Sequence, residues 1–274
     1  MGALYNATRK EFLIEQYQIG IFTRNNAELF SREPHPWLTG IGLGTSRQFT
    51  GGEPIPGAEA LLAAIFGDET NRRAGVLKGK TIVNEKFTME ALESLDGNFP
   101  LVHIVSHFVF ERGNSQQSFL RLGDGKMYTV ARMREVPDLF SGVELLSIPI
   151  CESAVQDPDP YGREIEAFAD LAQHLGAKSV IASLWKVSYH VTPKLMQRFY
   201  ELAKVHPDWP KSELLRQSKL SLLRGDIALV RHPDIARGSC GSKLKPRSRF
   251  SPSRKAPFAH PYYWSAFVLY GSPR

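Results

Sequence analysis

Six short apolar runs along the chain have the pattern of buried strands. They are rich in Val, Ile, Leu and Phe and do not alternate strictly with polar residues. That composition is typical of parallel strands whose two faces are both covered. The predicted strands cover residues 18–23, 38–44, 101–110, 144–150, 178–185 and 263–271.

Amphipathic segments between these runs have the three-to-four-residue spacing of helices. The predicted helices cover residues 57–66, 163–175, 192–203 and 211–223. The third of them starts with Thr192 and Pro193, an N-cap residue followed by a proline in the first turn. Because strands and helices alternate, we predict an α/β fold with a mainly parallel central sheet flanked by helices.

A small β-hairpin is predicted directly after the strand at 101–110. Residues 119–122 and 126–130 read as its two strands, and the sequence Gly-Asp-Gly at 123–125 lies between them. Asp-Gly is a favoured hairpin turn, because its second residue tolerates positive φ. We therefore expect one antiparallel insertion in the otherwise parallel fold.

The composition is that of a globular protein. The 274 residues are 42% hydrophobic, which is enough for one large domain, and we treat residues 1–274 as a single domain. No apolar run approaches the roughly 18 residues that a membrane span needs. The first residues lack the basic-then-apolar layout of a secretory signal, so we expect a cytoplasmic protein without membrane partners.

The positive charge is concentrated in one segment, residues 231–257. This segment carries eight lysines and arginines against one aspartate, and it is rich in Gly, Ser and Pro. We predict a flexible basic loop inserted before the last strand, either a solvated surface insertion or a regulatory or self-cleaved element. The rest of the chain is close to neutral and few aromatics interleave the charges, so nucleic-acid binding is not favoured.

The two cysteines, Cys151 and Cys240, are too few for a disulfide framework. Neither belongs to a CxxC pair and no HExxH motif occurs, so we predict no metal site and no cofactor. Cys240 lies in the basic segment, where we expect a spare exposed thiol. Cys151 differs, because it directly follows the predicted strand at 144–150.

Cys151 and His107 are the candidate catalytic residues. Both come near the carboxyl end of a predicted strand, which is where sites form in open α/β sheets. If the two strands are neighbours, the imidazole can take the thiol proton and later return it to a leaving amine. The backbone N–H of Cys151 is then a candidate oxyanion donor. We expect His103, four residues before His107, to be buried and hydrogen-bonded.

Six segments resemble the CHAT domain, a caspase-like module found with tetratricopeptide repeats and distantly similar to separase and the caspases. They are PIPGAEA (54–60), VHIVSHFVF (102–110), FLRLGDG (119–125), LLSIPICESA (145–154), SVIASLWKV (179–187) and HPYYW (260–264). The resemblance implies a caspase-like three-layer sandwich. It also implies a clan CD cysteine endopeptidase that cleaves a protein or peptide, with His107 as base and Cys151 as nucleophile.

The chain departs from the family pattern beside both residues. Phe108 stands where many members have glycine. Its N–H remains a candidate oxyanion donor, and its ring is expected to narrow the site. Pro149 occupies a position where the family has a small residue before the cysteine. These departures leave open an alternative function, a catalytically silent CHAT-type scaffold for protein interaction.

A third departure concerns specificity. Related separases hold a basic substrate side chain with an acid shortly after the Trp of the SLW segment, and Tyr189 stands at that position here. We expect a substrate pocket formed by Glu152, Trp185 and Tyr189. An arginine or lysine there would lack the acid that Tyr189 replaces, and burying a charge without that partner is costly. We therefore predict an uncharged residue before the scissile bond.

The family's first strand and its preceding repeats are missing from the matched region, so we expect a domain that is truncated or separately encoded. A free peptidase of this kind would be harmful, so we also expect activation by a partner, such as a protein with tetratricopeptide repeats.

Overall fold

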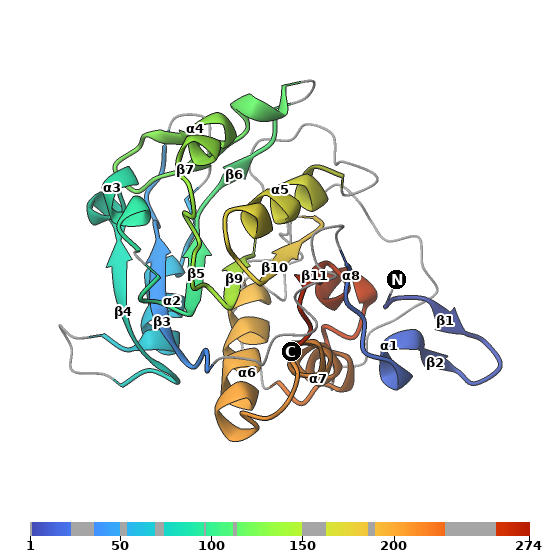
Figure 1. The fold of residues 1–274 in the computed structure, drawn as a ribbon. Coiled ribbons are helices and arrows are strands. Elements are labelled where there is room, and N and C mark those ends of the chain that lie inside the picture. The colour runs from blue at the N-terminus through green and yellow to red at the C-terminus, as the bar shows by residue number, and fades with distance from the viewer. Residues whose placement is uncertain are drawn as a thin grey trace.

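A six-stranded sheet forms the centre of the computed structural model (Figure 1). The structure describes residues 2–22, 36–49, 54–68, 74–95, 97–111, 114–149, 163–185, 190–227 and 256–274. The strands, in their order across the sheet, are β11 (Phe267–Gly271), β10 (Ser179–Ser183), β9 (Leu145–Ile148), β5 (Leu101–Val105), β3 (Thr39–Gly44) and β4 (Lys78–Val83). Among the described strand pairs of this central sheet, only β10–β11 is antiparallel, so the predicted, mainly parallel sheet is confirmed.

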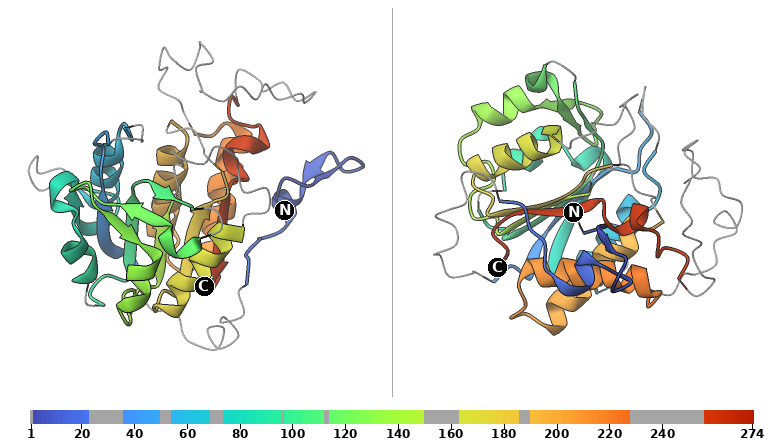
Figure 2. Two further views of the ribbon diagram at one scale, coloured as in Figure 1. Left: turned by 90° about the horizontal axis from the view of Figure 1, so that it is seen from above. Right: turned by 90° about the vertical axis from the view of Figure 1, so that its right-hand side faces the viewer.

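Helices cover both faces of this sheet, as Figure 2 (right) shows. One face packs against α2 (Ala58–Phe66), α6 (Thr192–Val205) and α7 (Lys211–Arg224). The other packs against α3 (Met89–Glu93), α4 (Val130–Glu135) and α5 (Arg163–His174). The result is the predicted three-layer sandwich. Within the described residues, no helix combines the length and the apolar composition that crossing a membrane requires.

The alternation of side chains along β5 explains how one strand serves both layers. Leu101 and Val105 belong to the core under α2 and α6, whereas Val102 and Ile104 belong to the core under α5. All four side chains are buried. Successive side chains of a strand point to opposite faces, so a continuous apolar run is what a strand buried on both sides requires.

The remaining elements are short. Two small sheets accompany the central one, and the first of them, the β1–β2 hairpin, projects from the body of the molecule (Figure 2, left). These elements are β1 (Tyr5–Asn6), β2 (Glu11–Phe12), α1 (Leu13–Gln16), η2 (Asn84–Lys86), β6 (Phe108–Val109), η3 (Ser115–Gln117), β7 (Phe119–Arg121), β8 (Met127–Thr129) and α8 (Pro261–Trp264). The antiparallel pair β7–β8 confirms the predicted hairpin, and Gly125 in its turn has φ of 92°.

The predicted strand at 101–110 is wrong in one respect, because the chain forms two strands in different sheets. β5 ends at Val105, and β6 pairs with β7 instead of continuing the central sheet. The hydroxyl of Ser106 donates to the carbonyl of Arg121, and the Arg121 N–H donates to the His107 carbonyl over 2.8 Å. These bonds draw the chain out of the central sheet. Every residue from Leu101 to Phe108 is buried, so no exposed polar residue marks the break.

Two other predicted strands need correction. In the described part of the range 18–23, which ends at Phe22, the backbone forms one bridge, Ile21 to Tyr270, in place of a strand. The Ile21 N–H donates to the carbonyl of Leu269, and the Ile21 carbonyl accepts from the Gly271 N–H, but this pairing is isolated. The predicted strand at 263–271 begins as helix α8, because the His260 side chain accepts the Tyr262 N–H and caps it. The strand itself starts at Phe267.

The predicted helices 57–66, 163–175, 192–203 and 211–223 correspond to α2, α5, α6 and α7. Thr192 is the first residue of α6, and Val191, not Thr192, occupies its N-cap position. Edge strand β4 was not predicted. Its first three residues, from Lys78 to Lys80, are exposed, so it lacks the apolar signal of its neighbours. Charged residues of this kind protect a sheet edge from pairing with other chains.

Helix α2 packs unusually close to β3. A Cβ atom at Gly42 would lie 2.8 Å from Leu62 and 3.0 Å from Phe66, both on α2. A larger side chain there would push the helix away from the sheet. The glycine therefore allows α2 to lie directly against β3.

A polar pair lies deep in the core under α6. His103 on β5 is fully buried, and its Nδ1 lies 2.8 Å from the hydroxyl of Tyr200 on α6. Burial lowers the pKa of His103 to about 3. The imidazole is therefore neutral near pH 7, and the expectation of a buried, hydrogen-bonded histidine is confirmed.

His103 should make the fold sensitive to acid. The unfolded chain binds a proton at this residue below about pH 6.5 while the folded chain does not, so stability is lost as the pH falls. Between pH 7 and pH 5 the expected loss in unfolding free energy is about 2 kcal/mol. Urea unfolding at both pH values should show a smaller loss for His103→Gln than for the parent. His174→Gln, at an exposed position of α5, is the control and should keep the parental loss. An equal loss in parent and His103→Gln would contradict the assignment.

Candidate active site

The two strands that precede the candidate catalytic residues are neighbours in the sheet. β5 and β9 run parallel, and Leu101, Val102 and His103 pair with Leu145, Leu146 and Ser147. Their carboxyl ends therefore meet at the same edge. In the sequence, His107 follows His103 by four residues, and Cys151 follows Ser147 by four.

Cys151 lies outside the residues that the structure describes, and so do Glu152 and Tyr189. Their predicted roles as nucleophile and pocket residues stay predictions. The same holds for the basic segment 231–257, of which only the last two residues are described.

His107 lies where the chain leaves the central sheet. Its side chain is buried, with 5% of its surface exposed. Its neighbours Ser106 and Phe108 both face the hairpin and α5, since Ser106 bonds Arg121 and Phe108 packs in the core on that side. Because the side chains on either side of it share one side, we infer that the His107 ring lies on the opposite side, that of Val105.

The Phe108 ring, which the sequence-based expectation placed at the candidate site, packs into the core under α5. It is fully buried, with its centroid 4.8 Å from that of Phe110 and 4.5 Å from that of Phe168 on α5. The direction of β6 turns this side chain into the core under α5. A phenylalanine at this position therefore strengthens packing on the face away from the His107 ring.

The backbone N–H of Phe108 points away from β7. Phe108 is opposite Leu120, and the bond from Arg121 N–H to the His107 carbonyl identifies this as a non-hydrogen-bonded pair. In such a pair, both residues direct their N–H and carbonyl groups outward from the ladder. This orientation is compatible with donation to a substrate oxygen, and the oxyanion role stays a prediction.

Trp185 lies two residues beyond β10, at the carboxyl edge of the sheet. Its indole N–H donates to the carbonyl of Tyr262 on α8 over 3.0 Å, and the two rings stack with centroids 6.3 Å apart. The side chain is half-buried. Trp185 therefore ties the end of β10 to α8, and its predicted place in a substrate pocket is not tested.

Comparison with known proteins agrees with this arrangement. A family model of the CHAT domain matches residues 1–272, nearly the whole chain. The chain belongs to the CHAT domain family. The mainly parallel six-stranded sheet flanked by helices is consistent with the caspase-like fold of that family. A search of curated proteins finds no match.

One polar network of this CHAT domain was not anticipated from its sequence. The Ser46 hydroxyl and the Asn84 amide each donate to Glu59 over 2.7 Å. These bonds lower the pKa of Glu59 and keep it ionised. Ser46 follows β3, Asn84 follows β4, and Glu59 is in the first turn of α2. The network thus fastens α2 to the carboxyl edge of the sheet.

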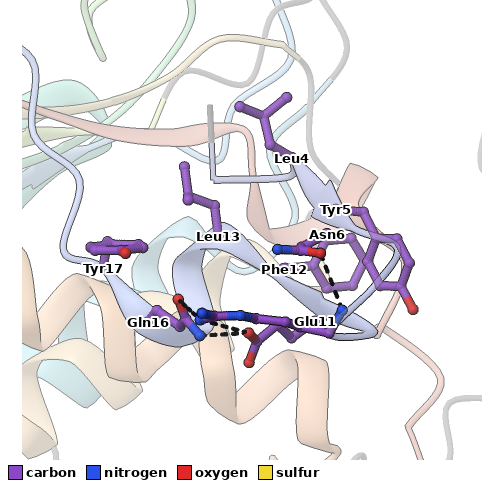
Figure 3. Close-up of a pocket in the computed structure, with 9 residues that line it drawn as sticks. Leu4, Tyr5, Asn6, Glu11, Phe12, Leu13, Gln16 and Tyr17 are labelled. Atoms are coloured by element: carbon purple, nitrogen blue, oxygen red, sulfur yellow. Dashed lines mark hydrogen bonds and ion pairs between the residues drawn. The ribbon is translucent and has the colours of Figure 1, made fainter.

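A hollow of the CHAT domain lies near the N-terminus, between β1, β2 and α1 (Figure 3). Its cavity volume is about 430 Å³. Its polar groups bond one another, since Gln16 donates to Glu11 over 2.5 Å and accepts from Arg9 over 3.2 Å. The nine described residues that line it include neither cysteine nor histidine, so this hollow does not carry the candidate chemistry.

In the part of the chain that the structure describes, no three His, Cys, Asp or Glu side chains gather closely enough to hold a metal ion.

The bond between Ser106 and Arg121 should contribute to holding the hairpin at the site. We expect Ser106→Ala to lower the unfolding free energy by about 1 kcal/mol, because the Arg121 carbonyl loses a buried donor. Urea unfolding measures this loss. Ser94→Ala, which removes an exposed hydroxyl that bonds within its own helix turn, is the matched control and should cost less. Equal losses in the two variants would contradict the proposed contribution.

Proposed function

We propose that this CHAT domain is a cysteine endopeptidase in which His107 activates the thiol of Cys151. The observation that carries the proposal is the parallel pairing of β5 with β9, which brings together the carboxyl ends of the strands that precede the two residues. The family membership agrees with it. Each residue stands the same number of positions beyond a directly paired residue, His103 or Ser147.

The chemistry follows from the two side chains. His107 takes the thiol proton, and the thiolate attacks the carbonyl carbon of the scissile peptide to form a C–S bond. The backbone N–H groups of Phe108 and Cys151 stabilise the oxyanion of the tetrahedral intermediate. His107 then gives the proton to the departing amine as the C–N bond breaks. Water, deprotonated by His107, hydrolyses the thioester and restores the thiol.

The proposed substrate is a protein or peptide with an uncharged residue before the scissile bond. Glu152, Trp185 and Tyr189 contribute to its pocket. Activation comes from a partner, for which a protein with tetratricopeptide repeats is the candidate, and the basic segment 231–257 is the candidate regulatory element. A cytoplasmic location belongs to the same proposal.

The alternative is a catalytically silent interaction domain. Phe108 favoured this alternative as long as its ring was expected to obstruct the site. The burial of that ring against Phe110 and Phe168 supports an unobstructed site and so the peptidase. Pro149 remains as the departure that favours a silent domain.

Covalent labelling by an electrophilic peptide probe tests the proposal. We expect the probe to modify Cys151 in the parent and the rate to fall at least about tenfold in His107→Ala, because loss of a positioned general base typically costs a hundredfold or more. Mass spectrometry of the labelled protein locates the modified thiol and follows its rate.

The chain offers matched controls for both residues. Cys240 is the second thiol, so Cys240→Ala should label as the parent does and Cys151→Ala should not label. His174→Ala, on an exposed part of α5, should leave the rate unchanged. Equal labelling of Cys151 with and without His107 would rule out the pair, and absence of labelling would favour the silent domain.

A further inference from the structure

A small apolar hollow lies at the carboxyl edge of the central sheet. It is enclosed by the segment entering α2, by the start of α6 and by the ends of β5 and β9. Its nine described lining residues are Ile55, Pro56, Gly57, Ala58, Leu61, Val105, Pro149, Thr192 and Pro193.

The hollow is lined by residues that lie close in sequence to the candidate catalytic pair. Val105 precedes His107 by two residues, and Pro149 precedes Cys151 by two. Val105 belongs to the core under α2 and α6, which is the side toward which alternation directs the His107 ring. The hollow is therefore on the same face of the sheet as the proposed base. Its lining residue Val105 lies two residues before that base along the chain.

The described lining residues favour an apolar side chain over a polar or charged one. Of its nine described residues, only Thr192 has a polar side chain. Three are prolines, which have no backbone N–H to donate. A charged or strongly polar group placed here would lose its water without gaining a charged partner from the described lining residues, at a cost of several kcal/mol.

The volume of the hollow limits the size of the apolar side chain that it can hold. Its cavity volume is about 20 Å³, roughly the space that one water molecule or one methyl group occupies. The walls belong to the sheet and to two helices, and the close contact of α2 with β3 at Gly42 keeps one wall in place. One methyl group of an alanine or valine side chain fits this space, whereas a long or aromatic side chain exceeds it.

The carboxylate next to the hollow is engaged elsewhere. Glu59 follows Ala58, but its side chain accepts hydrogen bonds from Ser46 and Asn84, beyond the ends of β3 and β4. Those strands lie on the far side of β5 from β9. Glu59 therefore does not supply the hollow with a counter-ion for a basic side chain.

We propose that this hollow takes the side chain of the residue before the scissile bond and selects a small aliphatic one. The proposal rests on the peptidase function proposed above. It adds the residues that determine specificity, chiefly Ile55, Ala58 and Pro149, and it narrows the substrate class from uncharged to small and aliphatic.

The test is a set of electrophilic peptide probes that differ only in the residue next to the electrophile, namely Gly, Ala, Val, Leu, Phe or Arg. On the full chain, labelling of Cys151 should be fastest with Ala or Val. It should be about tenfold or more slower with Phe and Arg, as one misfitting group in an apolar pocket typically costs tenfold or more. A parent that prefers Phe or Arg would overturn the proposal without any variant.

Two variants then change the hollow in opposite directions. Ala58→Val should slow the Val probe about tenfold and leave the Gly probe unchanged, whereas Ile55→Ala should speed the Leu probe relative to the Ala probe. Ala63→Val, also on α2 but not lining the hollow, is the matched control and should keep the parental ranking. Circular dichroism establishes that each variant is folded.

The outcomes separate the two proposals. Labelling of Cys151 that depends on His107 but keeps the parental ranking in both variants would overturn the specificity pocket and leave the peptidase standing. Absence of labelling by every probe would overturn both.

Discussion

The parallel pairing of β5 with β9 is the constraint on which the candidate site depends. Both strands are buried on two faces, and the register that pairs His103 with Ser147 brings their carboxyl ends to one edge. A slip of one residue would turn every side chain of a strand to the opposite layer. It would also bring the His103 imidazole out of reach of the Tyr200 hydroxyl. The core therefore fixes the register, and the register sets where the chain leaves each strand at the candidate site.

The break after Val105 is the second determinant. The hydrogen bonds between the Ser106–His107 segment and Arg121 pull the chain into the hairpin sheet. This change of sheet sends the Phe108 ring into the core under α5 and turns its N–H outward from β7. A substitution that in the sequence suggested an obstructed site is thereby accommodated in the hydrophobic core. Burial of a large aromatic ring there also stabilises the point from which His107 projects.

Much of the sheet could be predicted from the sequence, because strands buried on both faces leave continuous apolar runs. The break at Ser106 could not, since residues on both sides of it are equally buried. Edge strand β4 was not predicted, because its exposed first half contains Lys78 and Lys80 in place of an apolar run. The contacts of Glu59 also left no local signal. Its partners are 13 and 25 residues away in sequence, and only the folding of α2 onto the sheet brings them together. His107 was found from its position at a strand end and from its family motif, and its orientation needed the structure.

The proposed catalytic pair requires a short distance between two atoms, and a crystal structure of the chain that includes Cys151 measures that distance most directly. We predict that the Cys151 Sγ lies within about 5 Å of a ring nitrogen of His107, allowing for the looseness of a site without substrate. A separation beyond about 8 Å, with no movement in a probe-bound crystal that closes it, would contradict the pairing of His107 with Cys151.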